Sequence, residues 1–280
     1  MQLSNKMSEV ALFFPLIFGL LMAGVLAGLM AGLLGVGGGI VMVPAMALAF
    51  GALGYNPDIY HHVAVGTSLA VIIGTGFSSA FAHYKRGAVM LNIVKLWAPF
   101  VLISSFLGGV MAGMFSGDFL RIIFGVVALF VALNIIFPIQ KKLMSHLSAS
   151  PITNRISAFF IGYISSLMGI GGGSLSVPTL SAFGFSIHKS VGTSAAIGIF
   201  IAIAGTTGFI ISGWGVKDLP PFSLGFINLP AMVLIGVVAS LFAPIGAALA
   251  HKLDAKWLKI FFAIFLCLVG TKMLLQVLLG

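Results

Sequence analysis

The sequence predicts an all-α, polytopic membrane protein built from two tandem copies of one helical unit. Three observations predict this fold: an apolar composition, a series of long apolar segments, and two motifs that each occur twice in the same order. Of the 280 residues, 60% are hydrophobic and only 7% are charged, whereas soluble domains carry about 25% charged residues. A soluble fold of this size could not bury so much apolar surface, so we expect a lipid bilayer around the chain.

The remaining composition excludes several other classes of protein. The net charge of +9 does not indicate nucleic-acid binding, because the basic residues stand singly or in pairs between apolar runs. Such a distribution is typical of membrane proteins with positively charged cytoplasmic loops. The single cysteine, Cys267, excludes a disulfide framework and a cysteine-rich metal site within the chain. The first apolar run, at about 10–34, is too long for the core of a cleavable signal peptide.

Ten apolar segments follow one another along the chain. Eight of them approach the roughly 20 residues that a helix needs to cross a bilayer. The segments at 39–53 and 174–185 are too short, and each follows a glycine cluster, so we expect broken or re-entrant helices there. The ten segments are 10–35, 39–53, 63–83, 93–116 and 119–138 in the first half, and 155–170, 174–185, 190–213, 223–250 and 257–279 in the second.

An internal repeat accounts for this arrangement. The motif GVGGGIVMVP at Gly35–Pro44 matches GIGGGSLSVP at Gly169–Pro178, and its first glycines lie 134 positions apart. A second motif, HVAVGTS at His62–Ser68, matches HKSVGTS at His188–Ser194, with its histidines 126 positions apart. Two matched motifs in the same order indicate a duplication. The predicted transmembrane repeats are residues 1–140 and 141–280.

The basic loops indicate how the two repeats are oriented in the bilayer. The loop at 85–86 and the linker at 141–155 are both basic and are separated by two predicted spans. In the second repeat the basic loop falls at a different place, at 251–256. An odd number of crossings in each repeat gives this pattern, and this is the arrangement of inverted repeats. Parallel repeats are the alternative.

The two glycine clusters predict unwound backbone within the membrane. Non-helical backbone is tolerated there only inside protein or along a cavity, so the clusters suggest a central cavity. Helices that resume at Ile40 and Ser174 would direct their N-termini inward, where free N–H groups bind anions. The alternative is that these glycines only allow helices to pack closely. The candidate backbone ligands are Gly37, Gly38, Gly39, Gly171, Gly172 and Gly173.

Hydroxyl groups accompany both clusters. The Gly-Thr-Ser triplets each begin a long apolar run, where a hydroxyl can bind a ligand oxygen or cap a helix. The second copy has serines where the first has Ile40 and Met42, so the two halves of the site are chemically unequal. The candidate hydroxyl ligands are Thr67, Ser68, Ser174, Ser176, Thr193 and Ser194.

Two histidines, His62 and His188, occupy matched positions before the triplets and are candidates for proton coupling. The alternative is that they anchor the chain at the membrane boundary. No spacing typical of a zinc site is present, and we expect neither a metal nor a cofactor. We find no nucleophile elbow, pair of catalytic acids or Walker loop, so we also expect no enzyme activity.

Acidic residues are missing from the predicted spans. The five carboxylates all fall at segment ends or in loops, whereas cation and proton pathways place ionisable residues within the membrane. An anion needs none of them, because backbone N–H groups, hydroxyls and cations bind it. Lys95 and Lys189 lie close to spans and could attract an anion, or their side chains could extend to the interface. The five are Glu9, Asp58, Asp118, Asp218 and Asp254.

The motif Gly35–Pro44, the triplet Gly66–Ser68 and their second copies together resemble the sulfite exporter TauE/SafE family, a group of bacterial and archaeal permeases. The resemblance covers essentially the whole chain. It implies a multi-pass protein of the inner (plasma) membrane that transports sulfur-containing anions such as sulfite, thiosulfate, sulfoacetate or related organosulfonates.

We therefore expect a secondary carrier for a small anion, with its site at the interface of the two repeats near the middle of the membrane. Alternating access would move one repeat against the other. An anion-selective channel is one alternative, and a membrane scaffold or enzyme without transport is another. The residues leave the direction of flux, the coupling ion and the oligomeric state open.

Overall fold

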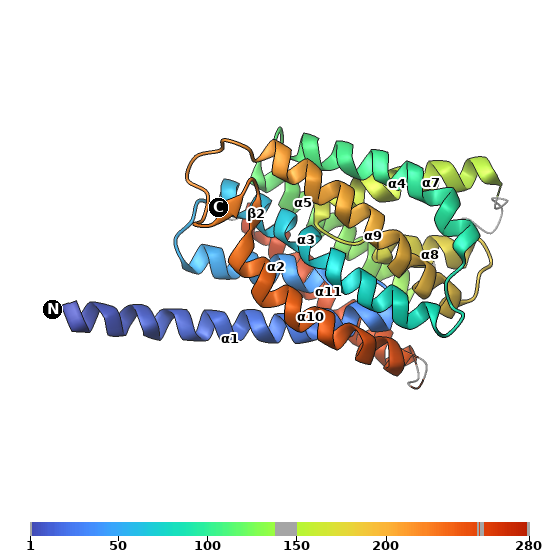
Figure 1. Cartoon of the computed structure of the whole chain (residues 1–280), viewed down its shortest axis with the longest axis horizontal. Coiled ribbons are helices and arrows are strands. Elements are labelled where there is room, and N and C mark those ends of the chain that lie inside the picture. Colours follow the sequence, from blue (N-terminus) through green and yellow to red (C-terminus); the bar gives the residue numbers. More distant parts are fainter. Residues whose placement is uncertain (1, 138–149, 251, 253–254, 279–280) are drawn as a thin grey trace.

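The computed structural model describes residues 2–137, 150–250, 252 and 255–278. Within these ranges the chain forms ten α-helices and one short β-hairpin (Figure 1). The elements are α1 (Gln2–Leu34), α2 (Gly39–Ala52), α3 (Pro57–Tyr84), α4 (Leu91–Ala112), α5 (Gly117–Ile136), α7 (Pro151–Met168), α8 (Gly173–Ala182), α9 (Ile187–Ser212), β1 (Ser223–Leu224), β2 (Ile227–Asn228), α10 (Leu229–Ala250) and α11 (Ala255–Leu278).

Six of these helices are long and apolar enough to cross a membrane. They are α1 over Phe14–Leu34, α3, α4, α5, α9 and α10. The all-α, multi-pass prediction is therefore confirmed, and six of the eight expected full spans meet this criterion. Among the described residues, α7 does not meet it, and α11 contributes a shorter apolar stretch at Ala263–Leu278.

The two short helices occur where the glycine clusters predict them. α2 has 14 residues and α8 has 10. The sixth residue of each helix is a proline, Pro44 in α2 and Pro178 in α8. Their N-caps are Gly38 and Gly172, with φ of 81° and 76°. This left-handed backbone is open to glycine at little cost. The glycines therefore end the preceding helix and allow the chain to turn into the next one.

Local sequence signals start the longer helices. Asn56 accepts a hydrogen bond from the Asp58 N–H at 3.0 Å, and Pro57 follows as the first helical residue of α3. Ser150 accepts one from the Thr153 N–H at 3.2 Å, and Pro151 begins α7. Both are the expected combination of a polar N-cap with proline at the next position.

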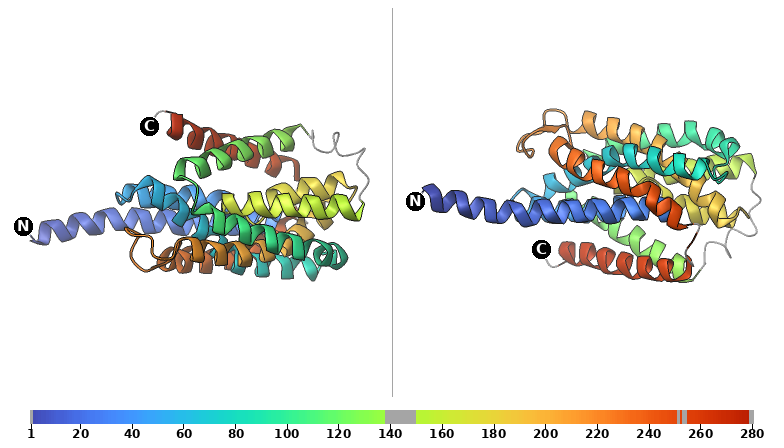
Figure 2. Two further views of the ribbon diagram at one scale, coloured as in Figure 1. Left: turned by 90° about the horizontal axis from the view of Figure 1, so that it is seen from above. Right: turned by 60° about the horizontal axis from the view of Figure 1, so that its bottom comes forward.

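The helices pack as pairs that join the two halves of the chain. α1 packs along α10, and α7 packs along α4. α3 and α9 lie against each other at the centre, while α5 and α11 lie side by side along one flank (Figure 2). Helices of the first half therefore find most of their neighbours in the second half.

Small residues allow the closest of these contacts. A Cβ added to Gly32 or Gly246 would collide with backbone of the facing helix in the α1–α10 pair. Gly108 and Gly162 lie in the same way between α4 and α7. Such contacts are typical of helix packing in membranes, where close approach of small residues provides the attraction. Glycine at these positions therefore allows close packing of the helices.

Large apolar side chains cover the outside of the bundle. Exposed ones occur on most of the spanning helices, which suits contact with lipid rather than water. They include Phe18, Phe81, Phe106, Phe130, Phe160, Ile203 and Leu241.

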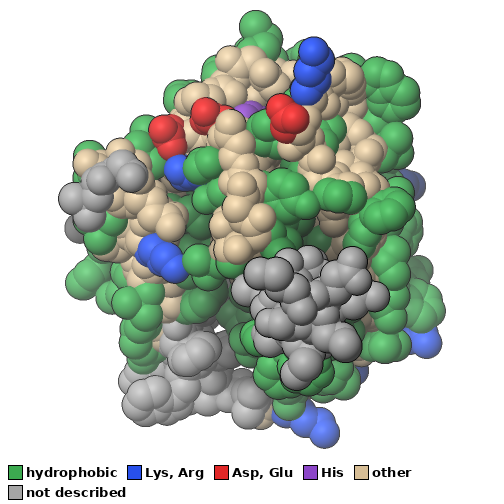
Figure 3. Space-filling view, turned by 90° about the vertical axis from the view of Figure 1, so that its left-hand side faces the viewer, with side chains coloured by type: hydrophobic (Ala, Val, Ile, Leu, Met, Phe, Trp, Pro, Cys, Tyr) green, Lys and Arg blue, Asp and Glu red, His purple; other side chains and the backbone are tan. Residues whose placement is uncertain are grey.

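The two ends of the bundle differ in charge. Figure 3 views the end at which both termini of the described chain lie, and acidic and basic side chains occur there together. This end includes the turn between α4 and α5 and the β-hairpin (Figure 1). The α3–α4 loop with Lys85 and Arg86, and the start of α7 with Arg155, lie at the opposite end.

Candidate functional site

The two glycine turns meet in the middle of the bundle. A Cβ on Gly37 would stand 3.3 Å from the Cα of Gly171, so the turns lie nearly in contact. A Cβ on Gly39 would collide with the carbonyl oxygen of Gly169, and one on Gly173 would collide with that of Gly35. The backbone of each turn therefore occupies the space that a side chain on the other would need.

The serines of the Gly-Thr-Ser triplets bind these turns across the two halves of the chain. Ser68 Oγ donates to the Gly169 carbonyl at 2.7 Å, and Ser194 Oγ donates to the Gly35 carbonyl at 3.5 Å. Both serines are fully buried. The pairs are reciprocal, because Gly35 and Gly169 occupy the same position in the two copies of the motif.

The threonines of the triplets bind the residues that precede two other helices. Thr67 Oγ1 accepts the Asn228 N–H at 2.8 Å, next to the start of α10. Thr193 Oγ1 accepts the Met90 N–H at 3.0 Å, next to the start of α4. In this conformation the triplet hydroxyls are therefore bonded to backbone, which is the capping alternative, and their role in binding an anion stays a prediction.

The second glycine turn also carries serines of a different kind. Ser176 Oγ is buried and has no hydrogen-bond partner among the described residues, and the same is true of Ser165 Oγ. A Cβ on Gly172 would stand 3.4 Å from Ser176 Oγ and 3.6 Å from Ser165 Oγ. Ser174, the remaining candidate serine, is buried beside them at the start of α8.

The expected central cavity is closed in this conformation. The described residues around the glycine turns enclose only a narrow void, too small for a water molecule, because the two turns pack back to back. It is lined by Ala31, Gly35, Gly37, Ile72, Gly76, Ser79, Gly171, Ala195 and Gly198. A ligand would reach this region only after the two halves move apart.

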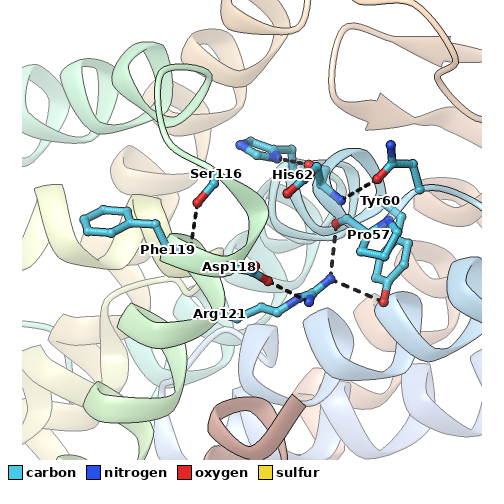
Figure 4. Close-up of polar contacts among 9 residues, drawn as sticks. Pro57, Tyr60, His62, Ser116, Asp118, Phe119 and Arg121 are labelled. Carbon is cyan, nitrogen blue, oxygen red and sulfur yellow. Dashed lines mark hydrogen bonds and ion pairs between the residues drawn. The ribbon is translucent and has the colours of Figure 1, made fainter. Parts of the chain in front are cut away.

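A larger pocket, of about 700 Å³, opens at the end viewed in Figure 3. It lies between α3, α5 and α11, and two cationic side chains, Arg121 and Lys272, line it together with Tyr60. The guanidinium of Arg121 donates to Asp118 Oδ1 at 2.9 Å and to the Pro57 carbonyl at 3.3 Å (Figure 4). The sequence interpretation missed this pocket, because Arg121 follows Asp118 in what reads as a neutral loop.

His62 is held by carbonyl oxygens on both sides of its ring. Nδ1 of His62 (Figure 4) lies 2.6 Å from the Asp58 carbonyl. Nε2 lies 3.0 Å from the carbonyl of Ala112 and 3.1 Å from that of Phe115. These contacts fasten α3 to the turn between α4 and α5.

The other basic candidates lie elsewhere. His188, which matches His62 in the repeat, is exposed, as are Lys95 and Lys189 near the starts of α4 and α9. His61, next to His62, is fully buried, and both of its ring nitrogens lack a partner within the described part of the chain. Proton coupling through His62 or His188 stays a prediction.

Comparisons with known proteins agree with this architecture. The family model described as sulfite exporter TauE/SafE matches residues 20–273. A probable membrane transporter protein of Haemophilus influenzae is 36% identical over 242 residues, which cover 86% of this chain and 92% of the relative. No solved structure matches the chain.

More distant relatives carry the same description. The probable membrane transporter protein YunE of Bacillus subtilis is 27% identical over 87% of this chain and 92% of its own. A probable membrane transporter protein of Methanocaldococcus jannaschii is 23% identical over 86% of this chain and 89% of its own. The matches extend over nearly the whole bundle, including both glycine turns and both triplets. The chain is therefore a multi-pass membrane transporter that belongs to the sulfite exporter TauE/SafE family.

Proposed function

We propose that this chain is a secondary carrier for a small sulfur-containing anion, such as sulfite, thiosulfate, sulfoacetate or a related organosulfonate, with its site where the two glycine turns meet. The observation that carries this proposal is the reciprocal arrangement at the centre of the bundle. Ser68 binds the second turn and Ser194 binds the first. A site shared by two similar halves is the arrangement on which alternating access depends.

The directions of the helices support inverted repeats of 1–140 and 141–280. In Figure 1, α1 runs away from the end where the termini lie, and α7 runs back toward it. α3 and α9 are opposed in the same way. The helix contacts also fit inverted repeats, since the first helix of each repeat packs on the fourth helix of the other: α1 on α10, and α7 on α4.

The charge at the two ends supports an orientation in the bilayer. The end with Lys85, Arg86 and Arg155 would face the cytoplasm, because positively charged loops are retained there. The opposite end, with the pocket lined by Arg121 and Lys272, would then face outward. An anion that arrives from outside meets these two cations before it reaches the glycine turns.

The closed centre supports an occluded state of a carrier. A channel needs a continuous path, and the described residues around the turns leave only the narrow void. A scaffold without transport would also have a closed centre. Ligand binding is therefore the property that distinguishes a carrier from a scaffold.

A panel of anions tests the proposal by thermal stabilisation of the purified protein. A ligand that binds the folded protein raises its melting temperature by mass action. We expect sulfite, thiosulfate, sulfoacetate or a simple sulfonate to raise it in a saturable way, and chloride at the same ionic strength to leave it unchanged. Equal responses to all anions would remove the sulfur-anion proposal, and steady single-channel currents in planar bilayers would replace the carrier with a channel.

A further inference from the structure

Three buried serine hydroxyls in the second half of the chain have no hydrogen-bond partner among the described residues, and two of them lie beside the second glycine turn. Ser165 is 1% exposed and Ser176 is 0% exposed, and neither Oγ has a partner in the part of the chain that the structure describes. A buried hydroxyl left unpaired destabilises the folded protein, because it loses its hydrogen bonds to water. Serines in membrane helices commonly avoid this cost by bonding to a carbonyl of the preceding turn, which these two do not do.

Both hydroxyls converge on the same place. Ser165 comes from the end of α7 and Ser176 from the first turn of α8. Both Oγ atoms lie 3.4–3.6 Å from the position that a Cβ on Gly172 would take. Gly172 is the N-cap of α8. The first N–H groups of a helix, here those of Gly173 and Ser174, have no acceptor within it.

The corresponding place in the first half of the chain is apolar. At the spacing of the glycine motifs, Ser165 corresponds to Ala31 and Ser176 to Met42. Both are buried, and neither side chain can donate a hydrogen bond. The two turns therefore have a similar backbone but different side chains. Hydroxyls at the first turn, such as that of Thr75, are bonded to its carbonyls, and among the described residues the unpaired buried hydroxyls belong to the second half of the chain.

The side chains that lie nearest to a Cβ placed on Gly172 are those of Ile201, Ser176 and Ser165, and none of them is basic. Lys95 on α4 and Lys189 on α9 are exposed near the starts of their helices. A buried anion here would be stabilised by hydroxyls, backbone N–H groups and the helix dipole alone. The cost of removing an ion from water rises with the square of its charge, so a doubly charged anion would be poorly compensated.

From this geometry we propose that Ser165 and Ser176, together with the start of α8, bind the oxygen atoms of a singly charged sulfonate or sulfite-like group. The proposal rests on the proposed function and narrows its list of substrates: hydrogensulfite and simple sulfonates carry one charge and fit this site, whereas thiosulfate and sulfoacetate carry two and fit it less well. The side chain of Ile201 on α9 lies against Gly172. The anion therefore reaches the two hydroxyls when α9 moves away from the turn.

The test measures the binding of methanesulfonate and sulfate to the purified full chain by calorimetry. These anions have similar oxygen arrangements but carry one and two charges. We expect methanesulfonate to bind at least about tenfold more tightly than sulfate. Ser165→Ala and Ser176→Ala should each raise the Kd for methanesulfonate about tenfold, since a hydrogen bond to a charged group contributes about 1.5–3 kcal/mol.

Ser166→Ala is the matched control. Ser166 is the next residue on α7, is equally buried and lacks a partner among the described residues, but its Oγ faces Gly108 of α4. Its removal should change the Kd by less than about twofold. Ser165→Cys and Ser176→Cys retain a polar hydrogen but weaken the donor, and should give the same loss as the alanine variants.

Three results would overturn the proposal. The Ser165→Ala and Ser176→Ala variants could bind methanesulfonate as tightly as wild type, Ser166→Ala could lose as much affinity as they do, or sulfate could bind as tightly as methanesulfonate. Exchange of methanesulfonate or of hydrogensulfite, the singly charged form of sulfite, by wild type in proteoliposomes separates this outcome from failure of the proposed function. If wild type exchanges these anions but the serine variants are unaffected, only the binding site is wrong. If wild type neither binds nor exchanges any of them, both proposals fail.

Discussion

Buried hydroxyl groups in this protein fall into two sets with different partners. Those of Thr67, Ser68, Thr193 and Ser194 are bonded to backbone in the other half of the chain. Those of Ser165, Ser166 and Ser176 have no partner within the described residues. A bonded hydroxyl stabilises the fold, whereas an unpaired one costs free energy unless a ligand uses it. The two sets should therefore respond in opposite ways to substitution by alanine.

Ser68→Ala is expected to lower the free energy of unfolding by about 1–3 kcal/mol, because the buried Gly169 carbonyl loses its donor. Ser166→Ala removes a hydroxyl of the same size and burial that has no partner in the described chain, so it should be neutral or stabilising. Reversible unfolding in mixed detergent micelles measures both. The assignment fails if Ser68→Ala is no less stable than Ser166→Ala.

At the scale of the helices, the threonines of the two triplets hold the starts of α10 and α4. Thr67 binds Asn228 at the end that we assign to the outside, and Thr193 binds Met90 at the cytoplasmic end. Gly66 and Gly192 let these segments approach, since a Cβ at either would stand 2.6 Å from the carbonyl of Phe226 or Ala88. Each bond thus joins the two halves of the chain on one side of the membrane.

Thr67→Val should loosen the outer end alone. Valine keeps the shape of threonine but cannot accept the Asn228 N–H, so backbone amides at 223–231 are expected to exchange hydrogen faster. Thr193→Val should instead speed exchange at 88–94 and leave 223–231 unchanged. Hydrogen–deuterium exchange with mass spectrometry measures both segments in each variant, and each variant serves as the control for the other.

A different pattern of exchange would contradict this assignment. If either variant accelerated exchange equally at both ends, the bonds would support the fold as a whole rather than one side of it. If neither segment responded, the threonines would not hold these helix starts.

At the scale of the whole molecule, the glycine clusters predicted where the short central helices begin, but the central cavity expected between them is closed. The starts of α2 and α8, at Gly39 and Gly173, lie within one residue of the expected Ile40 and Ser174. A glycine cluster changes the conformation of the backbone next to it, so its effect can be predicted from the local sequence. Apolar length was less informative, because the 18 residues of α7 include polar ones and do not meet the criterion for a span.

Long-range partners could not be predicted in the same way. Thr67 binds a backbone group 161 positions away, and no local pattern identifies that group. Ser165 stands in an ordinary apolar run, and its significance depends on what α8 places beside it. The pocket lined by Arg121 and Lys272 needs α5 and α11 to pack together. The repeat did offer one signal for Ser165, namely the contrast with Ala31 at the matched position.

Solute counterflow in proteoliposomes is the most direct test of the central claim that the two halves alternate around an anion at the glycine turns. Vesicles loaded with unlabelled sulfite or thiosulfate should accumulate the labelled anion transiently, with a rate that saturates and that rises with the anion on the opposite side. Gly173→Ala, whose Cβ would collide with the Gly35 carbonyl, should abolish this exchange. Flux that neither saturates nor responds to the anion on the opposite side, or no flux of any of these anions, would contradict the account.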